Sequence, residues 1–464
     1  MLDPVINIGS RRELFFDQFL LQNRYGIFFK LHRPERREVS LQMEMPWEDN
    51  IASFNSVVQD GAVVRLYYRA SIPDRKNEDL QAVALAESYD GGITFQRPVL
   101  GLVAFNGSRQ NNLLYLGEPP GIPPAFLDTN PACDAAQRYK GLSSRWKALY
   151  ASSSPDGIHW QPMQDEPLQM TGTFDTINTA FWDRITGCYR CYTRYFINLD
   201  EDSSEEDVLG RKPTVVRAIQ SATSTDFIHW SEPLPNVYND PYQDMQLYTN
   251  AVVPCPGAEH IYLSFPNRYV QERVKYPQHP YPGVNDALFM ASRDGVHWNR
   301  FAEAWMRPGL DERNWTERNN YPAWGIVQTS PREWSMYISE HYRQPDGVLP
   351  RLRRLAIRPH GFVSLHANYN GGDVITKPLL FDGKELRLNY STSAAGYLQV
   401  GVLDHEGVAL PGLSQDDMEP LFGDALDEVI RWKGGSDLST LAGKPIRLHF
   451  NLRDADLFAM RFSP

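Results

Sequence analysis

The chain has 464 residues, with 57 acidic and 46 basic side chains and a formal net charge of −11. This acidic balance excludes a nucleic-acid surface, which needs a basic face to neutralise phosphates. Aromatic residues are numerous (11 Trp, 23 Tyr and 22 Phe), and 34 Pro and 32 Gly are spread through the chain. This composition favours many short strands and turns, and the length predicts two domains.

The chain carries no run of about 18 apolar residues, so we expect no membrane span. Residues 1–7 lack the basic and apolar regions of a signal peptide, which predicts a cytoplasmic protein in this form, or a secreted or periplasmic one if a signal has been removed. Of the four cysteines, Cys188 and Cys191 form a C-x-x-C in an alternating, strand-like stretch. No second pair completes a zinc site, so we expect plain thiols in a reducing compartment and no metal.

Residues 1–45 hold short strand-like pieces and predict an N-terminal lead-in. A motif, Ser-x-Asp-Gly-x-x-Trp, then recurs at 154–160 and 292–298, with Phe227 in the Gly position at 224–230 and a looser copy at 88–95. Its Asp stands at 90, 156, 226 and 294, at spacings of 66, 70 and 68. The Asp can bond backbone N–H groups across a turn and Gly supplies a positive φ, so we interpret the motif as structural.

Each repeat contains four short strands, and the repeats begin near residues 52, 111, 178, 248 and 321. The fifth ends in a degenerate turn at 358–362. Four strands per repeat are typical of a propeller blade, which predicts a five-bladed β-propeller over residues 46–366. Segments after 366 alternate with period two and predict a β-sandwich over 367–464. The expected fold class is all-β.

Three insertions interrupt the repeats. Residues 200–207 are strongly acidic and predict a solvated surface loop; a structural calcium site there is the alternative, and no other cofactor is expected. The proline-rich stretches 119–124 and 276–282 predict rim loops, where binding residues tend to lie.

In a propeller, the loops that enter the inner strands form one funnel-shaped face. Acids at equivalent places should therefore converge from distant parts of the chain. The candidates are Glu48 and Asp49 for the first blade, Asp128 for the second, Asp175 for the third, Asp244 for the fourth, and Glu317 for the fifth, with Glu340 and His341 at the end of its second strand. Carboxylates among aromatic, Asn and Arg side chains are what glycosidic cleavage needs.

The chain resembles the invertase-like and arabinanase-like glycoside hydrolases of families 32 and 43. It is most similar to a bacterial group labelled family-32-like or sialidase-like. The stretches that carry the resemblance are 100–108, 174–183, 248–252 and 389–396. The resemblance implies an acid at the first blade (Glu48, with Asp49 as alternate), a transition-state-stabilising Asp at the third (Asp175) and a general acid from a later blade.

For that general acid we favour Glu340, followed by Glu317 and Asp244. The invertase motifs Asn-Asp-Pro-Asn-Gly, Arg-Asp-Pro and Glu-Cys are absent, which argues against a fructoside substrate. The turn motif lacks one residue of the sialidase Asp-box, and the sequence does not assign an arginine triad.

We therefore predict a furanosidase-like glycoside hydrolase, exo-acting on a plant or microbial glycan, with carbohydrate as its partner and the oligomeric state left open. The expected catalytic residues are Glu48, Asp49, Asp175 and Glu340. The expected substrate-binding residues are Arg69, Asp244, Tyr248, Asn250, Arg268, Glu317, Arg318, Asn320 and His341. The alternatives are a non-catalytic glycan-binding propeller and a lyase acting on uronic-acid glycans.

Overall fold

The computed structural model describes residues 4–70, 81–118, 121–145, 147–198, 215–242 and 244–463. The predicted acidic loop at 200–207 and part of the proline-rich stretch 119–124 lie outside the described residues. The described chain is all-β, as predicted, and its helices are four 3₁₀ turns: η1 (Ala135–Gln137), η2 (Glu312–Asn314), η3 (Gln415–Asp417) and η4 (Ser439–Leu441). It divides into a propeller-like unit (34–255 and 259–356) and a C-terminal unit (1–33, 256–258 and 357–464).

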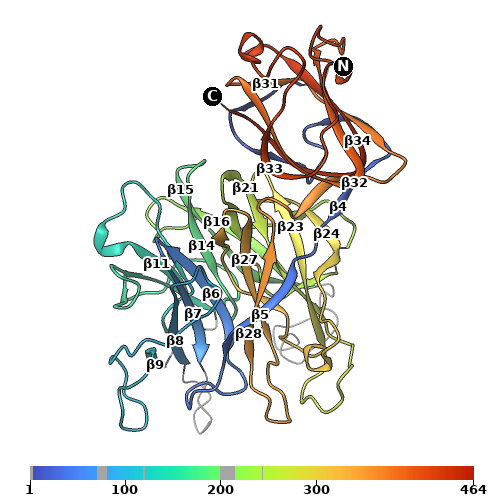
Figure 1. The fold of residues 1–464 in the computed structure, drawn as a ribbon. Coiled ribbons are helices and arrows are strands. Elements are labelled where there is room, and N and C mark those ends of the chain that lie inside the picture. The colour runs from blue at the N-terminus through green and yellow to red at the C-terminus, as the bar shows by residue number, and fades with distance from the viewer. Residues whose placement is uncertain are drawn as a thin grey trace. The chain divides into compact units, whose positions relative to one another are not determined.

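The propeller-like unit contains four sheets that follow the predicted meander of consecutive antiparallel strands (Figure 1). The first is β6 (Ser53–Asp60), β7 (Val63–Ala70), β8 (Gln81–Ser88) and β9 (Leu113–Gly117); the second is β10 (Ala125–Leu127), β11 (Tyr139–Arg145), β12 (Ala148–Ser154) and β13 (Gln161–Pro162). The third is β14 (Thr179–Asp183), β15 (Cys188–Asn198), β16 (Val215–Ser224) and β17 (Leu234–Pro235). The fourth is β20 (Val253–Cys255), β21 (Ala258–Ser264), β22 (Asn267–Val270), β23 (Val284–Ser292) and β24 (His297–Met306), extended by β18 (Val237–Tyr238) and β19 (Gln246–Leu247).

The last sheet departs from the predicted fifth blade. It contains β25 (Tyr321–Pro322), β26 (Val327–Ser330), β27 (Glu333–Glu340) and β28 (Arg351–Ile357), and its outer strand is β5 (Glu35–Gln42), from before the first blade. The prediction of five chain-consecutive blades is therefore wrong for this sheet, because the chain after β28 does not return to pair with it. The first sheet meets this last one where Val57 N donates to Trp324 O at 2.8 Å.

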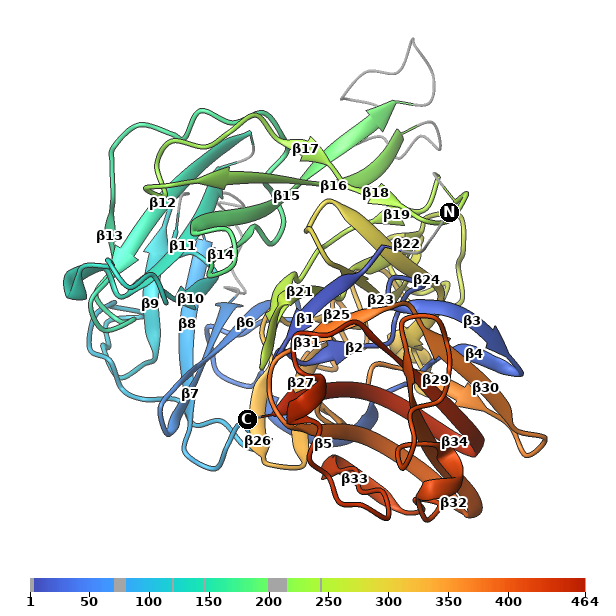
Figure 2. The ribbon, with the colours of Figure 1, turned by 90° about the horizontal axis from the view of Figure 1, so that it is seen from above.

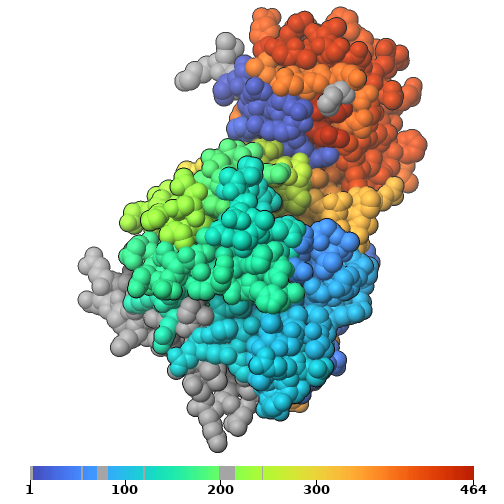
Figure 3. All heavy atoms as spheres, turned by 90° about the vertical axis from the view of Figure 1, so that its left-hand side faces the viewer, coloured from blue at the N-terminus to red at the C-terminus, as the bar shows by residue number. Residues whose placement is uncertain are grey.

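The boundary between the first two repeats also differs from the prediction. Residues near 111, expected to open the second repeat, instead lead into β9 of the first sheet, and the second sheet begins at β10. Successive sheets lie next to one another on the surface, where cyan atoms give way to green (Figure 3).

The Asp turns join neighbouring sheets, which confirms their structural interpretation. Asp156 Oδ1 accepts the backbone N–H groups of Ile158 and His159, both at 2.8 Å. Gly157 has φ 77°, and its carbonyl accepts the Tyr67 hydroxyl of the first sheet at 3.0 Å. The same tyrosine-to-glycine bond joins Tyr192 to Gly295 (2.9 Å) and Tyr337 to Gly92 (2.6 Å).

The Asp226 turn lacks this tyrosine-to-glycine bond because both residues are replaced. The strand pairing places Leu142 where Tyr67 and Tyr192 stand in their own sheets. The turn of the next sheet has Phe227 in the Gly position, at φ 70° and fully buried, in the same apolar cluster as Leu142. The phenyl ring fills space that a tyrosine occupies elsewhere, so the two substitutions belong together.

The C-terminal unit contains one ten-stranded sheet, and the predicted sandwich of separate sheets is not found. Its strands are β1 (Ile6–Gly9), β2 (Glu13–Leu14), β3 (Leu21–Tyr25), β4 (Ile27–Leu31), β29 (Val363–Ala367), β30 (Gly372–Thr376), β31 (Leu379–Phe381), β32 (Glu385–Asp404), β33 (Asp424–Val429) and β34 (Ile446–Ser463). The strands form one sheet because β32 and β34 are long, with 20 and 18 residues. These two strands pair along most of their length and run side by side in Figure 2.

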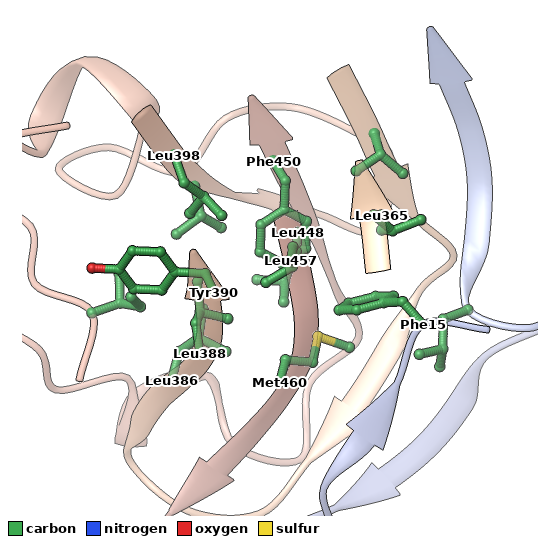
Figure 4. Packing of buried hydrophobic residues seen from close by; sticks show 14 of the residues in the cluster. Phe15, Leu365, Leu386, Leu388, Tyr390, Leu398, Leu448, Phe450, Leu457 and Met460 are labelled. Atoms are coloured by element: carbon green, nitrogen blue, oxygen red, sulfur yellow. The ribbon is translucent and has the colours of Figure 1, made fainter. Parts of the chain in front are cut away.

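The expected N-terminal lead-in supplies four of these strands, β1 to β4. Phe15, which follows β2, packs edge-on against Phe450 of β34 with ring centroids 6.2 Å apart. Figure 4 shows it pointing into the core with Leu365, Leu388 and Met460. The first 33 residues thus belong with the C-terminal sheet, because their apolar side chains complete its core.

Candidate functional site

Strained backbone collects at the end of the propeller-like unit where loops enter the inner strands. Five non-glycine residues there have positive φ: Ala251 (43°), Arg318 (56°), Asn320 (59°), His341 (64°) and Arg343 (53°). Such residues are uncommon and cluster at functional sites, where the surrounding structure holds them in place. This end lies opposite the Asp turns, as the sequence predicted for the site.

Asp175 lies at this end, in the loop that leads into β14. Its side chain is 34% exposed, and Oδ1 accepts a hydrogen bond from Nη2 of Arg194, whose side chain is 4% exposed. The ion pair holds one carboxylate oxygen and leaves the exposed part of the group facing outward. A carboxylate positioned by a buried guanidinium is suited to stabilising positive charge beside it.

A pocket of about 480 Å³ opens beside Asp175. Its wall comes from the first three sheets and includes Arg69, Ser143, Arg145 and Asn178. Arg69, predicted to bind substrate, therefore lies in the same pocket as Asp175. The volume is in the range of small-molecule sites and suits one or two sugar residues.

Tyr248 lies just after β19, with 8% of its surface exposed. Guanidinium carbons of Arg217, Arg194 and Arg318 lie 5.1, 5.3 and 5.7 Å from its ring centroid. Burial acts to raise the pKa of Tyr248, but Arg318, Arg194 and Arg217 outweigh it, so the pKa is lowered from its ordinary value of 10.0. No described residue is hydrogen-bonded to its hydroxyl. This side chain forms a phenolate more readily than an ordinary tyrosine.

The arginines around Tyr248 are themselves held in place. β16 and β19 lie side by side (Figure 2), which brings Arg217 Nη1 within 2.6 Å of Gln246 Oε1. Arg318 Nη1 donates to the Tyr342 hydroxyl at 3.0 Å.

Glu317 contacts two of the guanidiniums at this end. Its side chain is 5% exposed, with Arg343 Nη1 3.3 Å and Arg318 Nε 3.8 Å from its carboxylate. Contacts therefore run without a break from Asp175 through Arg194 to Tyr248, and onward through Arg318 to Glu317. Arg194 and Arg318 thus each connect one carboxylate to the ring of Tyr248.

Glu48, a predicted catalytic residue, is buried in a saturated network. It accepts hydrogen bonds from the backbone N–H groups of Glu44 and Met45 (3.0 and 3.1 Å) and from the Tyr68 hydroxyl. Arg97 Nε and Nη2 bind its two oxygens at 2.9 and 2.7 Å. With five donors and a fully buried side chain, this carboxylate stabilises the loop and is poorly placed to meet a substrate.

Glu340, the favoured general acid, is likewise enclosed. Arg351 Nε lies 2.7 Å, Arg353 Nη2 3.2 Å and Arg36 Nε 3.4 Å from its carboxylate, which is 2% exposed. Arg36 of β5 and Arg351 and Arg353 of β28 therefore surround Glu340 at the end of β27, so this carboxylate joins the strands of the last sheet. The neighbouring His341 is bonded through Nε2 to Asp311 Oδ2 at 2.6 Å.

The remaining predicted acids lie in three different settings. Asp128 follows β10 instead of preceding it, so it lies at the end of the propeller-like unit that carries the Asp turns. Its carboxylate accepts hydrogen bonds there from Lys140 Nζ (2.5 Å) and the Tyr189 hydroxyl (2.7 Å). Asp244 is exposed to solvent, and Asp49 is half-buried beside the first inner strand.

Several predicted sugar-binding residues have hydrogen-bond partners within the protein. Asn250 is buried and bonded to Thr179 Oγ1 at 2.7 Å and to the carbonyls of Ile177 and Tyr192. Asn320 Nδ2 donates to the Asn285 and Asn314 carbonyls, both at 3.0 Å. Arg268 binds both oxygens of Asp286.

Sequence reasoning missed Arg194 and Arg217. Both are charged residues in strands whose other positions are mostly buried, β15 and β16, and each lies toward the end that faces the site. A guanidinium within an apolar strand is a detectable signal, because charged side chains are seldom buried without a partner.

The described ranges contain no group of three or more His, Cys, Asp or Glu that could hold a metal ion, and their four cysteines are unpaired. None of the helices in the described part of the chain is long and apolar enough to cross a membrane.

No protein-family model matches the chain, and no curated protein matches its sequence. Among solved structures it is similar to a complex of BT0996 with RGII (TM-score 0.46, 11% identity, covering 71% of this protein and 93% of that one). An N-acetylgalactosamine deacetylase from F. plautii, in complex with blood group B trisaccharide, gives a TM-score of 0.44 at 11% identity, covering 72% and 96%. A third similar structure comes from the GH130 family of mannoside phosphorylases, which is described as containing glycoside hydrolases that target β-1,2 mannosidic linkages in Candida mannan. Its TM-score is 0.44 at 13% identity, and the match covers 72% of this protein and 94% of that one. These likenesses are too distant to assign an activity.

Proposed function

We propose that the protein is a glycoside hydrolase whose reacting groups are Asp175, Tyr248 and Glu317. The observation that supports this most directly is the continuous set of contacts that connects two carboxylates, through Arg194 and Arg318, to one readily ionised tyrosine. Glycosidic cleavage needs a nucleophile, a proton donor and a group that stabilises positive charge at the anomeric carbon.

Each residue suits one of these roles. The Tyr248 phenolate attacks the anomeric carbon and forms a bond to it through its oxygen, while the bond to the leaving oxygen breaks. Glu317 gives its proton to that leaving oxygen. Asp175, already paired with Arg194, stabilises the charge that develops on the sugar. Water then attacks the glycosyl–tyrosine bond, and Glu317 takes up the proton, which returns all three groups to their starting state.

Two further predictions from the sequence, the mode of cleavage and the number of blades, belong to this proposal. We propose exo-action on a plant or microbial glycan, because the pocket beside Asp175 has room for one or two sugars. We also propose that the five sheets correspond to the five blades of families 32 and 43, which the hydrogen bond between Val57 and Trp324 supports. The furanoside character stays a prediction.

A second function, β-elimination on a uronic-acid glycan, is favoured by one observation. A lyase needs a base to remove the proton next to a carboxylate and cations to neutralise that carboxylate. Tyr248, with its lowered pKa and three guanidiniums, offers both. Elimination leaves an unsaturated product that absorbs in the ultraviolet. Hydrolysis adds water across the glycosidic bond and forms no unsaturated product.

The test is a screen of aryl-glycosides and polysaccharides with the wild type, Asp175→Asn and Tyr248→Phe. Asp165→Asn, an exposed carboxylate outside the site, is the matched control. The hydrolase proposal expects a reducing-sugar product without new ultraviolet absorbance, lost in both site variants and kept in the control. Binding of glycans without any cleavage would instead support a non-catalytic glycan-binding protein.

A further inference from the structure

Arg217 differs from the other arginines in the interior of the propeller-like unit. Arg97, Arg300 and Arg354 each lie within 2.7 Å of a carboxylate oxygen. Among the described residues, no Asp or Glu lies within 4.0 Å of the Arg217 guanidinium, whose one hydrogen-bond partner is the neutral amide of Gln246. Its positive charge therefore has no carboxylate partner in the described part of the protein.

Aromatic rings hold this guanidinium in a fixed orientation. Its central carbon lies 5.1 Å from the ring centroid of Tyr248, 5.2 Å from that of Tyr269 and 5.9 Å from that of Phe196. Stacking on ring faces keeps a guanidinium plane in place without neutralising it. Burial is the main cause that lowers the pKa of Arg217, so the charged form is held at a cost that a bound anion would offset.

Unused hydrogen-bond donors lie around the same tyrosine. Nε of Arg217, Nε of Arg318, and both Nε and Nη1 of Arg194 are buried and have no acceptor among the described residues. Buried donors without an acceptor are rare in native structures and call for an explanation such as an absent ligand. Arg194 is already paired with Asp175, whereas the nearest carboxylate of Arg318 is 3.8 Å away.

We propose that Arg217 and Arg318 bind the carboxylate of an acidic sugar, so that the substrate class is a glycan containing a uronic or related sugar acid. This inference rests on the proposed function for its sugar component. A carboxylate supplies the negative charge that Arg217 lacks and two oxygens that match the planar array of guanidinium donors. A neutral sugar could accept hydrogen bonds here but would leave Arg217 without a carboxylate partner. Arg194 keeps Asp175 in position and is not part of this pair.

The test measures binding and does not require cleavage. Isothermal titration calorimetry compares D-glucuronate, D-galacturonate and N-acetylneuraminate with D-glucose and D-galactose, on the wild type, Arg217→Gln and Arg217→Lys. We expect at least one sugar acid to bind at least 10-fold more tightly than its neutral counterpart. Arg217→Gln should lose at least 10-fold of that affinity and Arg217→Lys less. The control is Arg138→Gln, since Arg138 also lies over a tyrosine ring (Tyr139, 5.5 Å) but near the Asp turns; its affinity should be unchanged.

Two results would overturn the inference: equal affinity for acids and neutral sugars in the wild type, or undiminished acid binding in a folded Arg217→Gln. Inorganic phosphate is titrated in parallel, and phosphate binding as tight as that of the best sugar acid would show a general anion site and would also overturn it. Thermal unfolding confirms that each variant is folded. If sugar acids bind but no glycan is cleaved, the proposed function fails and this inference stands. If neutral glycans are cleaved but no sugar acid binds, this inference fails and the proposed function stands.

Discussion

The guanidinium of Arg194 lies between Asp175 and Tyr248: one of its nitrogens donates to the aspartate, and its central carbon lies 5.3 Å from the tyrosine ring. One buried arginine thus contacts two side chains whose loops are 73 positions apart in sequence. The arrangement explains why a tyrosine with little exposure remains suited to ionise.

Tyr248→Phe should abolish most glycan cleavage while the protein keeps its fold. The hydroxyl has no described hydrogen-bond partner, so its removal leaves the packing of the ring unchanged. We expect kcat to fall roughly 10³-fold or more, as for loss of a nucleophile. Thermal unfolding should shift by only about 1 kcal/mol or less. Cleavage at the wild-type rate would remove Tyr248 from the mechanism.

Tyr248 should lose its proton at a lower pH than an ordinary tyrosine requires. The direction follows from its lowered pKa, because Arg318, Arg194 and Arg217 stabilise the phenolate. The measurement is the tyrosinate absorbance of the wild type minus that of Tyr248→Phe, followed as a function of pH. Removing one cation in Arg217→Gln raises the pKa, so this absorbance change should move to higher pH, and an unmoved change would show that Arg217 does not control the ionisation.

Glu48→Gln and Asp175→Asn should have opposite effects on stability and activity. The fully buried Glu48 neutralises Arg97, so its loss should destabilise the protein by about 3 kcal/mol, at the lower end of the cost of breaking a buried ion pair because Arg97 is partly exposed. Asp175→Asn should cost less stability because Asp175 is 34% exposed, yet it should remove activity. Urea unfolding and initial rates measure the two effects. A stable but inactive Glu48→Gln would restore the sequence-based assignment.

Gly157→Ala should destabilise the protein more than Gly187→Ala. Both glycines have positive φ, 77° and 68°, so both substitutions carry the backbone strain of about 1–2 kcal/mol. A methyl group at Gly157 would also collide with the Tyr67 hydroxyl, whereas nothing lies within 4 Å at Gly187. The difference in unfolding free energy isolates the contact between the first two sheets. Equal losses in the two variants would mean that this contact is easily displaced.

The C-terminal unit should lose stability in acid through Asp427. Burial opposes its ionisation, but Arg461 and Arg12 outweigh burial and lower its pKa to about 2. A depressed pKa contributes stability above the unfolded value, about 4, and that stability disappears as pH falls from about 4 toward 2. Because the Asp427 side chain is 30% exposed, solvent screening limits its contribution to the free energy of unfolding to about 1–2 kcal/mol. Asp427→Asn should flatten this part of the unfolding profile, and an unchanged slope would contradict the assignment.

The sequence was most informative where one residue type repeats. The Asp of each turn motif marks one end of a sheet, and counting back from Asp226 locates β14 and Asp175 at its mouth. The motif failed at the last sheet, because a strand contributed by Glu35–Gln42 has no local signal that assigns it there. The N-terminal strands were missed for the same reason: β4 pairs with β29, more than 300 residues away.

The candidate site was harder to predict because its roles depend on side-chain partners. Glu48 and Glu340 occupy the expected positions, but nearby arginines enclose both carboxylates, and sequence spacing does not show this. Tyr248 and Arg318 were expected only to bind substrate. The closeness of Tyr248 to Arg217 results from the packing of β16 against β19, which no local pattern encodes.

The central claim is that Asp175 and Tyr248 act together on a glycosidic bond. The most direct measurement is single-turnover cleavage of the best glycan from the screen by the wild type, Asp175→Asn, Tyr248→Phe and the double variant. We expect each single variant to lose nearly all activity and the double variant to lose little more, because the two groups act in one step. Full activity in either folded single variant would contradict it.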